Sequence, residues 1–278
     1  MSKSKRRLLL GNEAIARGLI ESGCTIATSY PGTPASEILA AVANFQKEAS
    51  LSMHTQWAVN EKVAFEIAYA GCQTGLRTAV SMKQVGLNVA SDPLMSAAYM
   101  GVNGGFVLIS ADDPGPHSSQ TEQDSRLMAM FAKIPVLDPD SPRQAKELMG
   151  VAYEISESFK IPVMVRPTTR VCHSRQDISL GAIQSDKREI KFDKNPARWA
   201  ATPKFRNQLH HKLNDKLAEV EAEFSQSPLN YVVDEGASDR VGVIASGVAF
   251  NTAHQSLLEL GVQVPLLKIG TPYPLPRR

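Results

Sequence analysis

The sequence has 278 residues, of which 43% are hydrophobic and 21% are charged, and its formal net charge is +2. This thinly spread charge, without a basic stripe or interleaved aromatic residues, excludes a nucleic-acid-binding surface. No apolar run approaches the roughly 18 residues that a membrane-spanning helix needs.

The first part of the chain alternates helix-like and strand-like patterns. The opening "MSKSKRRLLLG" has an apolar run of only three leucines, far short of a signal-peptide core, so we expect a cytoplasmic protein. Residues 12–22 have helical spacing that stops at Gly23, a natural C-cap. A strand over residues 24–30 leads into a tight turn, where Thr33 can cap a helix whose first residue is Pro34.

The next strand and helix place an acidic residue where the strand ends and the helix begins. We predict a strand over residues 51–57 and a helix that Asn60 caps and Glu61 begins. Four short apolar strands follow, at residues 78–82, 105–110, 134–138 and 161–166. Near-continuous apolar strands that alternate with helices predict an α/β fold, a parallel sheet with helices on both faces. Ligands of such sheets bind at the carboxyl ends of the strands, where Glu61 and the 30–34 turn both lie.

The remainder of the chain has a different character. Residues 174–235 are polar and charged, with one plausible surface helix over 205–226, and are typical of a linker or strap. A second α/β unit then begins, with a strand within 240–250, a helix over 251–261 and a strand over 264–270. One such unit cannot bury both faces of its sheet, so either it is incomplete or a partner completes it.

Four motifs in one order give a specific resemblance. They are "SYPGTPASE" (29–37), "NEKVAFEIAYAGCQTGLRTAVSMKQVGLNVASDPL" (60–94), "DDPGPHSSQTEQDSR" (112–126) and "RPTTRVCHSR" (166–175). Together they resemble the thiamine-diphosphate-dependent 2-oxoacid:ferredoxin oxidoreductases, in particular the alpha subunit of the indolepyruvate enzymes. The resemblance implies a pyrimidine-binding domain over 1–175, a polar linker over 176–238 and an incomplete transketolase-C-terminal-like α/β domain over 239–278.

The resemblance gives Glu61 a catalytic role. In this superfamily a glutamate at the matching helix start hydrogen-bonds N1′ of the aminopyrimidine ring of thiamine diphosphate. The role suits a carboxyl group that is partly withdrawn from water. The structural alternative is an acidic residue that only favours the helix dipole. Glu66, in the middle of the same helix, is the weaker rival.

The same resemblance implies further site residues. Those expected near the cofactor, besides Glu61, are Tyr30, Pro31, Gly32, Lys83, Gly86 and Asn88. Those expected near the 2-oxoacid are Thr33, Ser118, Ser119, Gln120 and Arg126, with Arg126 or a serine holding its carboxylate. Gly32 stands where the pyruvate enzymes of the family carry a bulkier residue, which favours a wider pocket for an aryl side chain. The structural alternatives are a helix cap for Thr33, a surface charge for Lys83 and a solvated loop for residues 117–126.

Several parts of a complete enzyme are absent from the sequence. No GDG motif grips the diphosphate through Mg²⁺, and Cys24, Cys72 and Cys172 are too dispersed for a disulfide framework, a metal site or an iron–sulfur cluster. We therefore expect no metal site on this chain, with Mg²⁺ and iron–sulfur clusters coming from a partner.

The resemblance implies oxidative decarboxylation of a 2-oxoacid, with indolepyruvate or another aryl pyruvate as the expected acid and with coenzyme A and ferredoxin as acceptors. The partner would be a subunit that carries the diphosphate-binding domain, in a homo- or hetero-oligomer. Two alternatives stay open: a subunit of a non-oxidative 2-oxoacid decarboxylase, and a truncated, noncatalytic remnant that only binds partners.

Overall fold

The computed structural model describes residues 6–184, 188–233 and 241–276. Its centre is a six-stranded, wholly parallel sheet in the order β3-β2-β4-β5-β7-β6. The strands are β2 (Ile26–Ser29), β3 (His54–Trp57), β4 (Thr78–Lys83), β5 (Phe106–Ala111), β6 (Val136–Leu137) and β7 (Val163–Val165). The predicted α/β architecture is confirmed.

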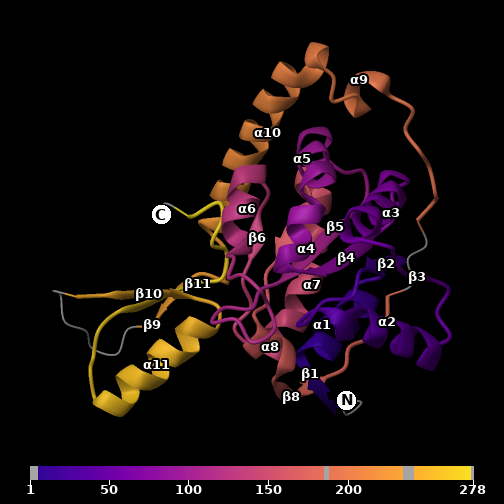
Figure 1. The fold of residues 1–278 in the computed structure, drawn as a ribbon. Coiled ribbons are helices and arrows are strands. Elements are labelled where there is room, and N and C mark those ends of the chain that lie inside the picture. The colour runs from indigo at the N-terminus through magenta and orange to yellow at the C-terminus, as the bar shows by residue number, and fades with distance from the viewer. Residues whose placement is uncertain (1–5, 185–187, 234–240, 277–278) are drawn as a thin grey trace.

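Helices cover both faces of this sheet (Figure 1). One face carries α1 (Gly11–Glu21), α2 (Ser36–Glu48) and α7 (Pro142–Phe159), and the other carries α3 (Glu61–Gln73), α4 (Gln84–Val89), α5 (Ser91–Met100) and α6 (Ser125–Ala132). Because side chains alternate across a strand, Val107 and Ile109 of β5 pack into the first layer, while Phe106 and Leu108 pack into the second. All four are fully buried, and each contributes about 1.5–3 kcal/mol of transfer free energy.

The helix after the 30–34 turn begins later than predicted. It starts at Ser36, and Ala35 rather than Thr33 is its N-cap residue, so the expected cap role of Thr33 is wrong. The Gly32 carbonyl accepts from the Ala35 amide at 2.7 Å, and the Gly32 amide donates to the Ser36 hydroxyl at 2.8 Å. These two bonds close a turn over residues 32–36, which delays the first helical residue by two positions.

A small antiparallel sheet lies outside the predicted elements. β1 (Arg6–Leu10) pairs with β8 (Arg175–Ser179), and α8 (Thr169–His173) precedes β8. The beginning of the predicted linker is therefore a strand. The two strands are more than 160 residues apart and mostly exposed, so neither a hairpin turn nor an alternating apolar pattern announces them.

The predicted surface helix contributes to the core. α10 (Pro203–Phe224), which follows the short α9 (Pro196–Trp199), buries four apolar residues on one face. Leu213 joins the core layer of α3 to α6, whereas Val220 and Phe224 join the layer of α1, α2 and α7. The helix therefore packs against both helical layers, while most of its charged residues face solvent and Lys216 donates to the Lys160 carbonyl at 2.7 Å.

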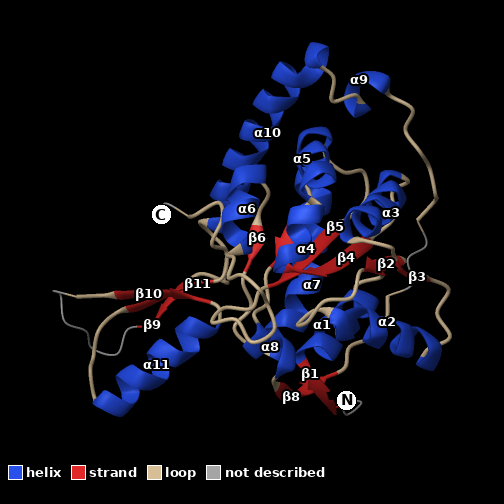
Figure 2. Cartoon of the chain, in the orientation of Figure 1, coloured by secondary structure: helices blue, strands red, loops and turns tan. Residues whose placement is uncertain are grey.

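The last unit contains the predicted strand, helix and strand. β10 (Val243–Ser246) pairs in parallel with β11 (Leu266–Ile269), and α11 (Val248–Leu260) connects them. A third strand that the sequence did not indicate, β9 (Tyr231–Val233), pairs antiparallel with β11. The unit extends to one side of the main body in Figure 2. It is joined there by hydrogen bonds from Val136 N to Tyr273 O (2.8 Å) and from Asp138 N to Gly270 O (3.0 Å).

None of the helices in the described part of the chain is both long and apolar enough to cross a membrane. The cytoplasmic location expected from the sequence stays a prediction.

Candidate active site

The carboxylate of Glu61 lies at the N-terminus of α3. Asn60 caps this helix as predicted, because its side-chain oxygen accepts from the Val63 amide at 2.9 Å. Glu61 is only 9% exposed. Within the described residues, its carboxylate takes part in no hydrogen bond or ion pair. A largely buried carboxylate normally finds a donor, so this one is available to a ligand.

Gly86 of α4 is packed directly against Glu61. A Cβ atom at position 86 would lie 2.3 Å from Glu61 Oε1 and 2.6 Å from Glu61 Cγ. Only glycine leaves room for the carboxylate here. The immediate neighbour of Gly86 is therefore Glu61 itself, and the predicted role of Gly86 near the cofactor stays a prediction. Among the other residues expected near the cofactor, Tyr30, Pro31 and Asn88 are exposed.

A second group of predicted residues gathers at the carboxyl ends of β2 and β4. The Lys83 ammonium donates to Ser118 O at 3.1 Å and to Ser118 Oγ at 3.4 Å. The Ser118 hydroxyl donates to Thr33 O at 3.3 Å. A Cβ atom at Gly32 would lie 3.0 Å from Lys83 Cβ. The structure therefore brings Gly32, Thr33, Lys83 and Ser118 together from three segments of the chain.

The other residues predicted to contact the substrate differ in their availability. Gln120 is exposed. The Ser119 hydroxyl is already engaged, since it donates to Asp113 and accepts from Gln84, each at 2.8 Å. Their roles toward a substrate stay predictions.

Arg126 is held by two carboxylates of its own chain. Its guanidinium donates to Asp124 through Nε and Nη2 and to Asp138 at 3.3 Å through Nη1. Burial raises the pKa of Asp124, but the hydrogen bonds and charge of Arg126 and Arg166 outweigh it and hold that pKa below its usual value. A substrate carboxylate would have to compete with Asp124 and Asp138 for Arg126.

Beneath this loop lies a buried polar network that the sequence did not reveal. Arg166 Nε donates to Asp112 at 2.7 Å, and the Ser125 amide donates to the same carboxylate at 3.0 Å. The Ser125 hydroxyl also donates to Asp112. The network fixes the start of α6 onto the ends of β5 and β7. The only signal was Asp112 in the third motif, whose partner Arg166 lies 54 residues away.

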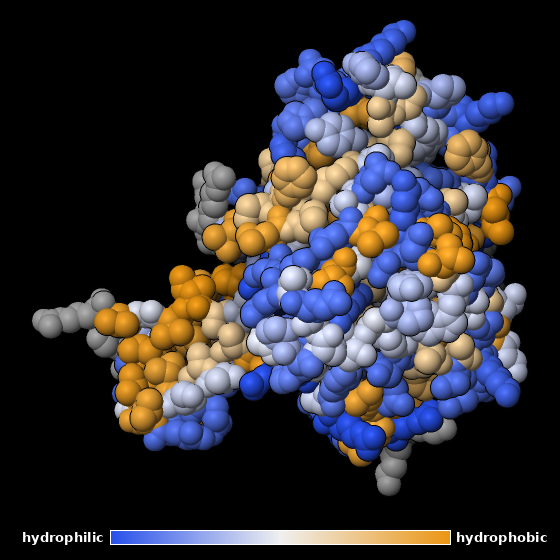
Figure 3. All heavy atoms as spheres, in the orientation of Figure 1, coloured by the Kyte–Doolittle hydropathy of each residue, from blue (hydrophilic) through white to orange (hydrophobic). Residues whose placement is uncertain are grey.

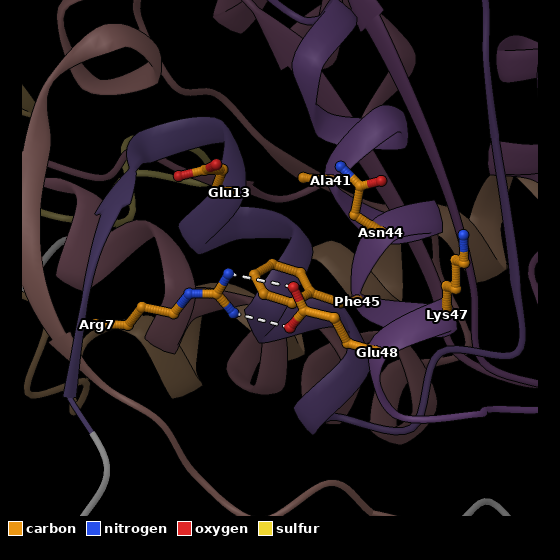
Figure 4. Close-up of a pocket in the computed structure, with 7 residues that line it drawn as sticks. All are labelled: Arg7, Glu13, Ala41, Asn44, Phe45, Lys47 and Glu48. Carbon is orange, nitrogen blue, oxygen red and sulfur yellow. Dashed lines mark hydrogen bonds and ion pairs between the residues drawn. The ribbon is translucent and has the colours of Figure 1, made fainter.

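Two surface grooves have similar volumes but differ in the residues that line them. One, of about 430 Å³, lies beside α1 and α2 and is lined by Arg7, Glu13, Phe45 and Glu48 (Figure 4). Its charged groups already have partners within the chain, since Arg7 pairs with Glu48 at 2.8 Å and Glu13 accepts from the Leu10 amide. The other groove, of about 440 Å³, runs between α4 and α6. Its lining includes Gln84 and Asn88 of α4, which flank Gly86 in the sequence, but it includes neither Glu61 nor Gly86.

Metal-binding side chains do not cluster in the described ranges, where no group of three His, Cys, Asp or Glu residues is placed to hold an ion. The cysteines are buried thiols. Burial raises the pKa of Cys72 to about 12. Cys72 is therefore a packing residue at neutral pH.

Comparison with known proteins shows the family to which the chain belongs. Residues 17–226 match the family described as pyruvate flavodoxin/ferredoxin oxidoreductase, thiamine diphosphate-binding. The chain belongs to this family. The resemblance inferred from the four motifs is thereby confirmed, and the family match includes Glu61, Gly86 and the loop of residues 113–119.

Relatives of this oxidoreductase family resemble the chain to different degrees. Indolepyruvate oxidoreductase subunit IorA of Methanothermobacter thermautotrophicus is 45% identical over 268 residues, which are 96% of this chain and 43% of the relative. IorA of Thermococcus kodakarensis is 45% identical, over 98% of this chain and 42% of the relative. The 2-oxoglutarate synthase subunit KorA of M. thermautotrophicus is 24% identical over 96% of this chain and 81% of the relative. The chain thus spans less than half the length of the IorA relatives.

A solved structure shares the fold. The 2-oxoglutarate:ferredoxin oxidoreductase from Magnetococcus marinus superposes with a TM-score of 0.78 at 18% sequence identity, over 99% of this chain and 55% of that chain. The agreement extends over nearly the whole chain, including the small β9–β11 unit.

Proposed function

We propose that this chain supplies the aminopyrimidine half of the thiamine diphosphate site of a 2-oxoacid:ferredoxin oxidoreductase. The reaction is oxidative decarboxylation of indolepyruvate or another aryl pyruvate to an acyl-coenzyme A, with ferredoxin as the electron acceptor. The observation that carries the proposal is the Glu61 carboxylate, which is largely buried and has no partner among the described residues. It lies within the part of the chain that matches the thiamine-diphosphate-binding family.

The residues present fit one half of the cofactor. Glu61 offers a hydrogen-bond acceptor of the kind that the pyrimidine N1′ atom requires, and Gly86 keeps the space beside it clear. When bound, thiamine diphosphate supplies the nucleophilic carbon and the electron sink for the reaction. The described residues offer no metal cluster for the Mg²⁺ and diphosphate half. That half, and any iron–sulfur cluster, is assigned to a partner.

The side chains at the strand ends then have separable tasks. Glu61 would share a proton with the pyrimidine nitrogen of the bound cofactor. The turn at Tyr30, Pro31 and Gly32 borders the cofactor side, as does Asn88. The cluster around Thr33 and Ser118, with Gln120 at its exposed margin, orients the 2-oxoacid.

An aryl pyruvate is the favoured substrate class for two reasons. The IorA relatives are 45% identical to this chain, compared with 24% for the KorA relative. Gly32 stands where the pyruvate enzymes of the family carry a bulkier residue, and a larger side chain there would displace the stem of Lys83. Both points concern which 2-oxoacid is bound, and they leave the proposed role of Glu61 unchanged.

Three partners follow from the proposal. Coenzyme A and ferredoxin are the co-substrates, and a subunit or further domain carrying the diphosphate grip completes the cofactor site. The expected assembly is a homo- or hetero-oligomer.

Isolation of the tagged chain with its natural partners tests this function. The complex is assayed for bound thiamine diphosphate and then given indolepyruvate, coenzyme A and oxidised ferredoxin. We expect stoichiometric cofactor and ferredoxin reduction that depends on both the acid and coenzyme A. Release of an aldehyde without ferredoxin reduction would identify a non-oxidative decarboxylase instead. A complex without thiamine diphosphate would identify a noncatalytic binding subunit.

A further inference from the structure

The loop of residues 113–119 is organised around the carboxylate of Asp113. Asp113 is 1% exposed, and its Oδ2 accepts from the amides of His117 (3.0 Å), Ser118 (2.9 Å) and Ser119 (3.2 Å). The Ser119 hydroxyl donates to the same oxygen at 2.8 Å, and Thr169 donates to Oδ1 at 2.8 Å. Five donors on one carboxylate determine the path of the loop.

A second contact ties this loop to the helix that faces Glu61. Gln84, the first residue of α4, is 1% exposed, and its Nε2 donates to Ser119 Oγ at 2.8 Å. Two residues later, Gly86 packs on the Glu61 carboxylate. The short helix α4 therefore contacts both the 113–119 loop, through Gln84, and Glu61, through Gly86.

Counting donors shows which groups in this loop are free to bind an anion. The amides of His117, Ser118 and Ser119 are all committed to Asp113. A serine hydroxyl has one proton to donate. That of Ser119 goes to Asp113, and that of Ser118 goes to the Thr33 carbonyl. None of these groups retains a donor for a carboxylate.

Lys83 is different. Its ammonium has three protons, and the two contacts to Ser118 O and Ser118 Oγ use at most two of them. Its charge is not neutralised by any acidic side chain in the described ranges, whereas Arg126 is paired with Asp124 and Asp138. The absence of a side chain at Gly32 gives the Lys83 stem its space, because a Cβ there would lie 3.0 Å from Lys83 Cβ.

We propose that Lys83 binds the carboxylate of the 2-oxoacid, and that the loop shaped by Asp113 and tied to α4 by Gln84 positions the Lys83 ammonium for this task. Asp113, Gln84 and Ser119 are positioning residues, and Ser119 does not contact the substrate. The inference rests on the proposed function only in taking a 2-oxoacid as the ligand. An uncompensated cation held by backbone and hydroxyl oxygens at a strand end suits a small monoanion.

Binding of an unreactive acid tests the proposal without turnover. Indole-3-acetate and its neutral amide are titrated into the assembled complex from which thiamine diphosphate has been removed. We expect the wild type to bind the acid about tenfold more tightly than the amide, because one charge-assisted hydrogen bond distinguishes them. Lys83→Met removes this preference, and Lys83→Arg restores most of it.

The matched control is Lys62→Met. Lys62 is an exposed lysine on α3 that pairs with Asp92 at 2.7 Å, so its loss is expected to leave the preference intact. Asp113→Asn is expected to weaken acid binding severalfold and to accelerate amide exchange at residues 117–119. A Lys83→Met complex that still prefers the acid would overturn the proposal, as would an Asp113→Asn loop with unchanged exchange. Failure of the proposed function would appear separately, as absent ferredoxin reduction in the wild type.

Discussion

At the scale of single residues, the site depends on one carboxylate and the glycine beside it. Glu61 is 9% exposed, and its carboxylate has no hydrogen-bond donor in the described part of the chain. The sequence predicted that Asn60 caps the helix and that Glu61 begins it, because these are local features, whereas only the family resemblance implied a role for Glu61. It could not predict that Gly86 touches Glu61, since this contact depends on how α3 and α4 pack.

Gly86→Ala is expected to displace the Glu61 carboxylate. The new Cβ would lie 2.3 Å from Oε1, so the side chain or α4 must move. We expect a loss of stability of about 1–3 kcal/mol from overpacking and at least a tenfold fall in cofactor affinity. Urea unfolding and thiamine diphosphate titration measure the two effects.

The matched control for Gly86→Ala is Gly150→Ala in α7. There the new Cβ would meet only Ser22 Oγ, at 3.4 Å, which is an ordinary contact. This variant should be neutral or stabilised by up to about 1 kcal/mol, because alanine favours a helix. If Gly86→Ala behaved like Gly150→Ala, the close packing against Glu61 would be refuted.

At the scale of elements, the sequence indicated the strands of the main sheet and most helices, because their apolar periodicity is local. It failed for β1, β8 and β9, which are short and mostly exposed. It also failed for the cap role of Thr33, because hydrogen bonds of Gly32 to Ala35 and Ser36 decide where α2 begins. The organisation of the 113–119 loop escaped prediction too, since Thr169 and Gln84 reach it from distant segments.

The 113–119 loop should be sensitive to acid. Burial raises the pKa of Asp113, but hydrogen bonds from Ser118, Thr169, Ser119 and His117 outweigh it, so this pKa lies well below its usual range. A carboxyl whose pKa is lowered by folding adds stability above its unfolded pKa, near 3.9, and this stability is lost as the pH falls. The stability advantage of wild type over Asp113→Asn should therefore shrink between about pH 5 and pH 2.

Urea unfolding across this pH range measures the difference. Asp92→Asn is the control, because Asp92 forms only an exposed pair with Lys62. Its effect should be small at every pH. A constant difference between wild type and Asp113→Asn down to pH 2 would show that the Asp113 hydrogen bonds do not stabilise the folded state.

At the scale of the whole molecule, one face of the small β9–β11 sheet has no helix packed on it within the described residues. Val232, Leu267 and Ile244 are cross-strand neighbours, and Val232 and Ile244 are 57% and 72% exposed. Helix α11 covers the opposite face. On that side, the Lys268 ammonium lies over the rings of Tyr231 and of Phe250 from α11. Hydrophobic residues gather over this unit in Figure 3. Such a surface is typical of a contact with another protein surface.

Charging this face should reduce association of the chain. We expect Ile244→Lys to lower the sedimentation coefficient of any self-associated species while leaving the thermal unfolding midpoint nearly unchanged, since the side chain is exposed. Lys212→Glu on α10 is a control that alters charge away from this face. Unaltered association of Ile244→Lys would exclude the uncovered sheet as the contact.

The most direct test of the central claim measures proton exchange at the thiazolium C2 atom of thiamine diphosphate in the assembled complex. The wild type, Glu61→Gln and Glu66→Gln are compared in deuterated buffer by rapid quench and NMR. Glu66 is the matched control, because it lies on the same helix and is exposed. The account predicts exchange at least 100-fold slower for Glu61→Gln, a barrier difference of about 2.7 kcal/mol, and an unchanged rate for Glu66→Gln. Exchange at the wild-type rate in Glu61→Gln would contradict it.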